Sequence, residues 1–161
     1  MCLTWVLLKG RVAFFLYARV STRKQSDAGN LARQIDRLNE YATRNNYIVN
    51  DVFQDIASGL NENRRGLQKL LCSIKEAQGA TVIVEYKDRL ARFGFSYLQQ
   101  YINDFGGKVI IVEQKENNAE RELVEDLIAI TTSFSARIYG KRGGQVAQKI
   151  EQILQEEGVF E

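Results

Sequence analysis

The sequence predicts an α/β fold: a mostly parallel sheet of about four to five strands, flanked by helices and followed by a long C-terminal helix. Short apolar runs alternate four times with segments whose apolar residues recur at helical spacing. Proline, which breaks helices, is absent. The 161 residues, 45% of them apolar, are enough to bury one sizeable core.

Each expected strand and helix has its own signal in the sequence. The runs VAFFLYA (12–18) and TVIVEY (81–86) are apolar throughout, as in strands buried on both faces of a sheet. Two further strands are expected at 47–53 and 108–113. The expected helices, whose apolar residues recur every three to four positions, span 30–45, 64–78 and 94–105.

The last third of the chain predicts one long helix over 119–139, which resumes after several glycines and runs to about residue 157. Its wide apolar face can pack on the chain's own core or against a partner helix in an oligomer. The expected division is an α/β core at 12–118 and this helix at 119–157. Residues 1–11 are interpreted as a leader, a linker remnant or an added strand.

The composition excludes several kinds of catalytic site. Histidine is absent, which removes histidine zinc ligands and Ser-His-Asp triads, and the two cysteines, Cys2 and Cys72, are far apart in the sequence. We therefore expect no metal, no cofactor and no disulfide framework, as suits a reducing cytoplasm. The apolar stretch at 3–8 is too short to span a membrane.

The charge is unevenly distributed, although the net charge is only +2. Residues 1–24 carry five basic side chains and no acid, and residues 137–149 carry four basic side chains and no acid. Residues 113–126 carry six acids against two basic residues. This distribution is compatible with a nucleic-acid-binding surface or with an ordinary solvated surface of mixed charge.

Polar residues that could handle a phosphate follow three of the expected strands. Arg19 and Ser21 point to the same side of an extended chain, because strand side chains alternate. Further candidates are Arg64 and Arg65 in NENRRGL, and Arg89 and Arg92 in KDRLARFG, where Asp88 lies beside them. Arg89 and Arg92 would share one face at the start of a helix. Each feature also has a plainer explanation, as a helix cap, a turn or a solvated helix face.

Cleavage of a phosphodiester without metal or histidine requires a nucleophile, cations that stabilise the developing negative charge, and a group that handles protons. Arginine is suited to this task because its planar guanidinium grips two phosphate oxygens at once. Glycine-rich phosphate loops of the Walker or dinucleotide-binding type are absent, which weighs against nucleotide binding.

Together, the segments YARVST (17–22), DIASGLNENRRGL (55–67) and EYKDRLARFG (85–94) resemble the catalytic domain of the serine recombinases, the resolvase/invertase family. With LVEDLIAITTSFSARIYGKR (123–142), the sequence is similar, more narrowly, to the serine transposases of small insertion sequences. The resemblance runs in order from about residue 12 to 142. It implies cleavage and rejoining of double-stranded DNA through a covalent 5′-phosphoserine, without metal or ATP.

The resemblance also implies residue roles. Ser21 matches the nucleophile, and Asp88 matches a carboxylate that handles protons or orients its neighbours. The arginines that match those holding the scissile phosphate are Arg19, Arg64, Arg89 and Arg92. The residues that match supporting positions are Tyr17, Gln25, Asp55 and Ser58.

Partners follow from the same resemblance. The family's long helix joins protomers into dimers and, during strand exchange, tetramers. Arg137, Lys141 and Arg142 are expected to contact DNA. Many members carry a separate DNA-reading domain after or before the catalytic domain. No such segment is evident in the sequence, so we expect a catalytic fragment or a chain whose reader was lost.

Two other functions are compatible with the sequence. One is a non-catalytic module of the same fold that oligomerises and pairs partners on DNA. The other is an unrelated α/β phosphoesterase or nucleotide-binding domain. A covalent protein–DNA adduct that requires Ser21 would distinguish the recombinase from both.

Overall fold

The structure, a computed structural model, describes residues 12–61 and 63–113, together with 123–128, 130–132, 134, 149 and 152. The chain divides into two compact units, Met1–Gln114 and Lys115–Glu161. The first unit contains the sheet, and the described part of the second is helical at 123–128, 130–132, 134, 149 and 152. The rest of the predicted long helix lies outside the described residues.

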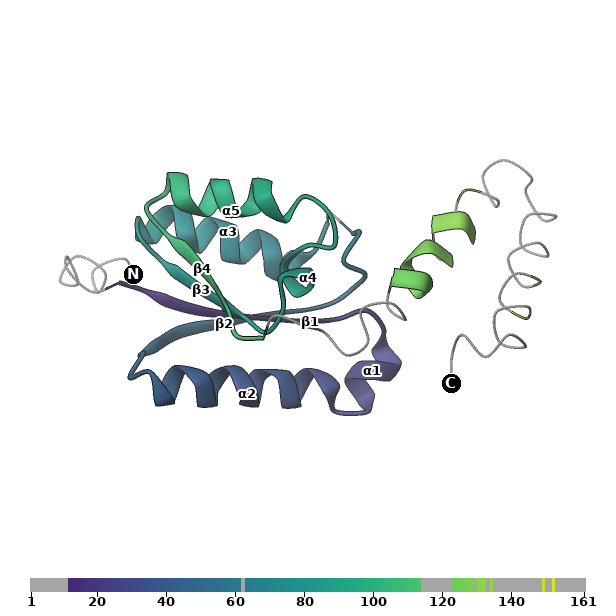
Figure 1. The fold of residues 1–161 in the computed structure, drawn as a ribbon, viewed down its shortest axis with the longest axis horizontal. Coiled ribbons are helices and arrows are strands. Elements are labelled where there is room, and N and C mark those ends of the chain that lie inside the picture. Colours follow the sequence, from purple (N-terminus) through teal and green to yellow (C-terminus); the bar gives the residue numbers. More distant parts are fainter. Residues whose placement is uncertain are drawn as a thin grey trace. The chain divides into compact units, whose positions relative to one another are not determined.

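The first unit is built on a four-stranded sheet in the order β2-β1-β3-β4 (Figure 1). The strands are β1 (Phe14–Val20), β2 (Val49–Ile56), β3 (Thr81–Val84) and β4 (Lys108–Ile111). All three strand pairings are parallel. The predicted α/β class with a mostly parallel sheet is therefore confirmed.

Helices cover both faces of the sheet (Figure 1). Helix α2 (Asn30–Arg44) lies on one face, and α3 (Arg65–Ala77) and α5 (Phe95–Asp104) lie on the other. Strand β1 contributes side chains to the hydrophobic core on both faces of the sheet. Leu16 and Ala18 pack on the α2 side, whereas Phe15 and Tyr17 pack on the side of α3 and α5. Its continuous apolar sequence reflects burial on both sides.

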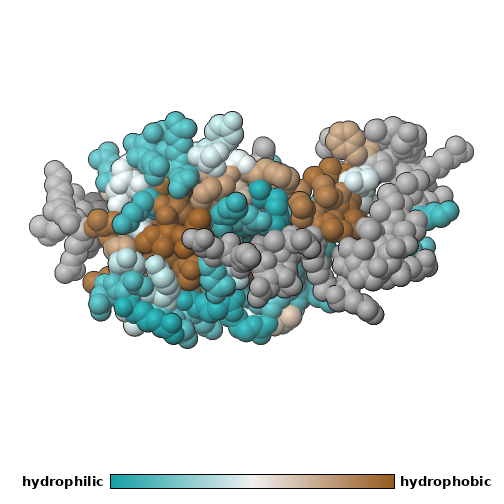
Figure 2. All heavy atoms as spheres, in the orientation of Figure 1, coloured by the Kyte–Doolittle hydropathy of each residue, from teal (hydrophilic) through white to brown (hydrophobic). Residues whose placement is uncertain are grey.

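The two helical layers are held by side chains at helical spacing. Leu31, Leu38 and Ala42 of α2 are buried on the sheet, and Leu70 and Ile74 of α3 are fully buried on the opposite side. Burial of each large aliphatic side chain stabilises the fold by roughly 1.5–3 kcal/mol. Figure 2 shows hydrophilic residues over α2 and an apolar band at the β4 edge, where Ile111 is exposed.

Three of the differences from the sequence prediction have a local reason. Strand β2 continues to Ile56 rather than ending at 53, because β1 pairs with it as far as Val20, past the point where the apolar pattern stops. A short helix, α1 (Arg23–Asp27), lies between the first expected strand and the first expected helix, where none was predicted, and the Thr22 side chain caps it. Helix α4 (Lys87–Leu90) ends before Arg92, so Arg89 and Arg92 do not share a helix face.

Candidate active site

Arg19 and Ser21 lie at the carboxyl end of β1, where the chain leaves the sheet. Arg19 Nη1 donates hydrogen bonds to Ser21 Oγ (3.0 Å) and to the Ala57 carbonyl (2.8 Å). The Arg19 side chain is fully buried and Ser21 is half-buried. A permanent positive charge therefore lies in direct contact with the hydroxyl proposed from sequence as a nucleophile.

The rest of the Arg19 guanidinium joins β1 to α4. Nε donates to the Arg89 carbonyl (3.3 Å) and Nη2 donates to the Asp88 carbonyl (3.1 Å). The fork of guanidinium donors suits it to hold several acceptors at fixed directions. Arg19 thus ties together the ends of two strands and the start of α4, in addition to contacting Ser21.

Gln34 of α2 fixes the backbone of Arg19 from the opposite face of the sheet. Its Oε1 accepts from Arg19 N (2.8 Å) and its Nε2 donates to Arg19 O (3.4 Å). Gln34 is 2% exposed. Sequence reasoning missed this residue, although the signal was present: a glutamine stands on the apolar stripe of α2 between Leu31 and Leu38.

Tyr17, Asp55 and Arg64 form a second group beside the first. The Tyr17 hydroxyl donates to Asp55 Oδ2 (2.9 Å) and accepts from Arg64 Nη1 (3.0 Å). Burial raises the pKa of Tyr17 above its ordinary value, and the Arg64 charge opposes that effect without overcoming it. Tyr17 is therefore a neutral phenol that bridges a carboxylate and a guanidinium.

Arg64 is 4% exposed and is anchored mainly to backbone. Nη1 and Nη2 donate to the carbonyls of Arg89 (3.3 Å) and Leu90 (2.7 Å), and Nε donates to the Asn61 carbonyl (2.9 Å). The Arg89 carbonyl therefore accepts from both Arg19 and Arg64. Two guanidinium groups from distant parts of the chain meet at the end of α4.

Asp88 and Arg92 form an ion pair around α4, with Arg92 Nη1 2.7 Å from Asp88 Oδ2. The side chain of Arg92 is 4% exposed and that of Asp88 is 20% exposed. Gly59 packs against this group: a Cβ there would lie 3.1 Å from Arg92 Cβ and 3.2 Å from Arg19 Nη2. The loop after β2 therefore approaches both arginines closely.

Two supporting residues shape the loops around Ser21. Gln25 Oε1 accepts from the backbone amide of Ser21 (2.9 Å). Ser58 Oγ accepts from the amide of Leu60 (3.1 Å), which folds the loop that holds Ala57 and Gly59 against Arg19. The other sequence-predicted catalytic and supporting residues are joined in one network of hydrogen bonds and ion pairs, Arg89 through its carbonyl, and Ser58 lies in the loop that borders this network.

The remaining predictions concern DNA-contacting residues, metal sites and membrane-spanning helices. Arg137, Lys141 and Arg142 fall outside the described residues. Within the described ranges, no cluster of histidine, cysteine, aspartate or glutamate side chains is arranged to hold a metal ion. Among the helices that the structure describes, none is long and apolar enough to cross a membrane.

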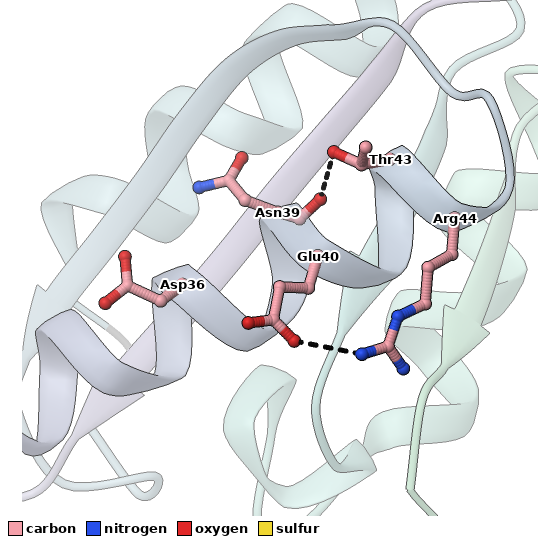
Figure 3. Close-up of a pocket in the computed structure, with 5 residues that line it drawn as sticks. All are labelled: Asp36, Asn39, Glu40, Thr43 and Arg44. Atoms are coloured by element: carbon pink, nitrogen blue, oxygen red, sulfur yellow. Dashed lines mark hydrogen bonds and ion pairs between the residues drawn. The ribbon is translucent and has the colours of Figure 1, made fainter.

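A hollow on the outer face of α2 is separate from this network (Figure 3). It is lined by Asp36, Asn39, Glu40, Thr43 and Arg44, all of them exposed. Glu40 and Arg44 form an ion pair one helical turn apart, 3.3 Å between Oε2 and Nη2. The hollow contains no residue proposed for catalysis.

The chain resembles known proteins over most of its length. Residues 14–152 match the family model described as the resolvase N-terminal domain. The catalytic domain of ISC1926 TnpA, an IS607-like serine recombinase, is 39% identical, with a TM-score of 0.75 over 89% of this chain and 99% of that one. A serine recombinase from Sulfolobus solfataricus is 37% identical, with a TM-score of 0.69 over 91% of this chain and 98% of that one.

Sequence relatives point the same way. A protein of Acanthamoeba polyphaga mimivirus that bears the name "Putative resolvase" is 39% identical over 128 residues. The match covers 78% of this chain and 64% of the relative. The chain therefore spans slightly less than two thirds of the length of that relative.

Proposed function

This chain belongs to the resolvase family of serine recombinases, and we propose that it is a catalytic domain that cleaves and rejoins DNA through a covalent 5′-phosphoserine. The observation that carries the proposal is the 3.0 Å hydrogen bond from Arg19 Nη1 to Ser21 Oγ, within a network that also includes the side chains of Arg64 and Arg92 and the carbonyl of Arg89. Here a hydroxyl and several guanidinium groups are assembled from segments far apart in sequence.

In the proposed reaction, Ser21 Oγ attacks a DNA phosphorus and displaces the 3′-oxygen. The Oγ–P bond forms and the P–O3′ bond breaks, which leaves a 5′-phosphoserine and a free 3′-hydroxyl. The positive charge of Arg19 favours the developing serine alkoxide, because opposite charge lowers the pKa of a hydroxyl. Asp88 is a partly exposed carboxylate of the network, and we assign it the transfer of protons to and from the reacting oxygens.

The other arginines stabilise the charge that builds up on the phosphorus oxygens. A pre-organised donor of this kind lowers the activation barrier by about 3–4 kcal/mol, which raises the rate roughly 10²–10³-fold. The phosphoserine ester retains the energy of the broken bond, so resealing requires no ATP. We accordingly propose that the reaction uses no metal or cofactor and takes place in the cytoplasm.

The proposal extends to the assembly that performs the reaction. The predicted helix at 119–157 joins protomers into a dimer and, during exchange, a tetramer, and Arg137, Lys141 and Arg142 contact the DNA backbone. The core at 12–118 supplies the chemistry. Exchange of strands requires cleaved ends from more than one protomer, which is why assembly and catalysis are linked.

The test is a search for the covalent intermediate. The protein is mixed with duplex DNA carrying a nick that traps the cleaved strand, and a denaturing gel resolves protein–DNA adducts. The unmodified chain should form an adduct and Ser21→Ala should not. Thr22→Ala, which removes the neighbouring exposed hydroxyl, is the matched control and should retain the adduct. DNA binding without adduct under all conditions would favour the non-catalytic pairing module instead.

A further inference from the structure

We propose that Tyr86 is a positioning residue for Arg89: its ring face holds the Arg89 guanidinium, and Glu113 fixes the ring. The proposal rests on the proposed function, since it assigns a role in placing a side chain that would grip the scissile phosphate. The Arg89 Cζ atom lies 5.7 Å from the centroid of the Tyr86 ring. The Tyr86 hydroxyl donates to Glu113 Oε2 at 2.8 Å.

The distance and burial both favour a cation–π contact. A guanidinium within about 6 Å of an aromatic centroid is attracted to the negative face of the ring, and the attraction strengthens when water is excluded. Arg89 is 8% exposed. The hydrogen bond to a carboxylate also increases electron density on the phenol, which strengthens the hold of the ring on a cation.

The sheet fixes both ends of this arrangement. Tyr86 is the N-cap residue of α4 and keeps the extended backbone of β3 (φ −132°, ψ 154°). Glu113 is held beside β3, because its amide donates to the Glu85 carbonyl at 2.9 Å. Glu85, 2% exposed, pairs with Arg37 of α2 at 2.5 Å on the opposite face of the sheet. The Tyr86 ring is therefore attached to a rigid frame rather than to a free loop.

A related pair occurs in the site, although there the arginine also donates a hydrogen bond to the tyrosine hydroxyl, from Arg64 Nη1 to Tyr17. Arg64 Cζ lies 6.0 Å from the centroid of the Tyr17 ring, and the Tyr17 hydroxyl donates to the Asp55 carboxylate. Each pair thus combines an arginine over a tyrosine ring with a carboxylate on the phenol. Two arginines of the site are therefore each adjacent to a separate tyrosine: Arg89 to Tyr86 at the end of β3, and Arg64 to Tyr17 within β1.

The experiment varies the ring's electrostatics without changing its shape. In the full chain, Tyr86 is replaced by Phe and by phenylalanines carrying one, two or three ring fluorines, which progressively weaken the negative face. Adduct formation on nicked DNA is followed over time at several DNA concentrations. The rate should fall stepwise with each fluorine. Tyr86→Leu, which removes the ring, should lower it by about 5–30-fold.

The DNA concentration for half-maximal rate should change little, because Tyr86 is expected to orient Arg89 in the transition state rather than to bind DNA itself. The matched control is the same fluorinated series at Tyr97, which is 78% exposed and has no assigned part in the site. Its rate should be constant. A flat series at Tyr86, or equal decreases at both positions, would overturn the proposal.

A second measurement needs no DNA chemistry. The Nε–H signal of Arg89, identified by its loss in Arg89→Lys, should carry a ring-current shift that disappears in Tyr86→Leu and persists in Tyr86→Phe. An unchanged shift in Tyr86→Leu would refute the contact. If the unmodified chain forms no adduct, the proposed function fails, and the Arg89 signal then decides the positioning contact alone.

Discussion

Arg19 and Arg92 carry the same charge but hold different partners. Arg19 is fully buried and donates to Ser21 Oγ and to the carbonyls of Ala57, Asp88 and Arg89. Arg92 pairs with the partly exposed carboxylate of Asp88. At the scale of single residues, Arg19 therefore supports the fold in addition to the chemistry proposed for it, whereas we propose that Arg92 acts mainly in the chemistry.

This difference predicts that replacing Arg19 lowers stability more than replacing Arg92 does, whereas replacing Arg92 mainly lowers activity. Arg19→Ala should lower the free energy of unfolding by about 3–5 kcal/mol, because it leaves buried carbonyls without their donor. Arg92→Ala should cost less, about 1–3 kcal/mol, because the Asp88 carboxylate that it leaves behind is partly exposed, yet it should nearly abolish adduct formation. Urea denaturation and the adduct gel measure the two effects. Equal loss of stability in both variants would contradict this assignment.

Tyr17 predicts a pH dependence of stability. Burial raises the pKa of Tyr17 above its unfolded value of about 10, so the folded state favours the protonated phenol. Its contribution is complete below pH 10 and is lost as the pH rises from there toward the folded pKa. The unfolding free energy of the unmodified chain, relative to Tyr17→Phe, should fall by up to about 1.4 kcal/mol per pH unit above pH 10. Parallel urea curves for the two proteins between pH 8 and 11.5 would show this difference, and identical slopes would contradict it.

At the scale of elements, Asp55 connects the end of β2 to the beginning of α3. Its Oδ1 accepts from the amide of Gly66 and its Oδ2 accepts from the amide of Leu67, both at 2.8 Å. A carboxylate at a helix N-terminus satisfies amides that lack an intrahelical partner and interacts favourably with the helix dipole. The same Oδ2 also accepts from Tyr17. One side chain therefore fixes where α3 begins and where the Tyr17 phenol points.

Gly66 makes this junction possible, and its replacement should separate the two elements. A Cβ at Gly66 would lie at 2.7 Å from Asp55 Oδ2 and still closer to the Gln54 carbonyl. We expect Gly66→Ala to lower the unfolding free energy by about 2–4 kcal/mol, through overpacking and loss of the Asp55 cap. Lys69→Ala, on the exposed face of α3, is the control and should change it by less than about 0.5 kcal/mol. A neutral Gly66→Ala would show that α3 can shift freely away from β2.

The sequence predicted well those elements that are buried on both faces. It predicted less well those in which one residue contacts two elements. The apolar runs predicted β1 and β3 because both strands are buried on both faces. The end of β2 was placed too early, since Asp55 looks like a turn residue and is in fact paired with Arg19 in the sheet. Gln34 was missed because a buried glutamine on an apolar stripe has a partner, the Arg19 backbone, that no local pattern reveals.

At the scale of the whole molecule, the first unit brings the described site residues together from β1, the β2–α3 segment and the β3–α4 segment. Sequence order alone could place each of these at a strand's carboxyl end, where ligands of parallel sheets bind. It could not show that most of the hydrogen bonds donated by Arg19 and Arg64 go to backbone carbonyls. Those contacts depend on the register between strands and on the short α4, which the apolar pattern does not encode.

The boundary at Gln114 predicts that folding and assembly can be separated. A chain ending at residue 114 keeps the sheet and its helical layers, so it should unfold in one cooperative transition. It lacks the helix at 119–157 that we propose joins protomers, so light scattering should report a monomer where the full chain is a dimer or larger. Adduct formation should be lost as well, if strand cleavage depends on assembly.

A chain ending at residue 157 is the matched control and should behave as the full chain does, because it keeps the whole predicted helix. Three outcomes would each contradict a specific step. A 114-residue chain that is unfolded would show that the first unit depends on the second. One that is dimeric would place the interface on the α/β core, and one that forms adduct at the full rate would separate cleavage from assembly.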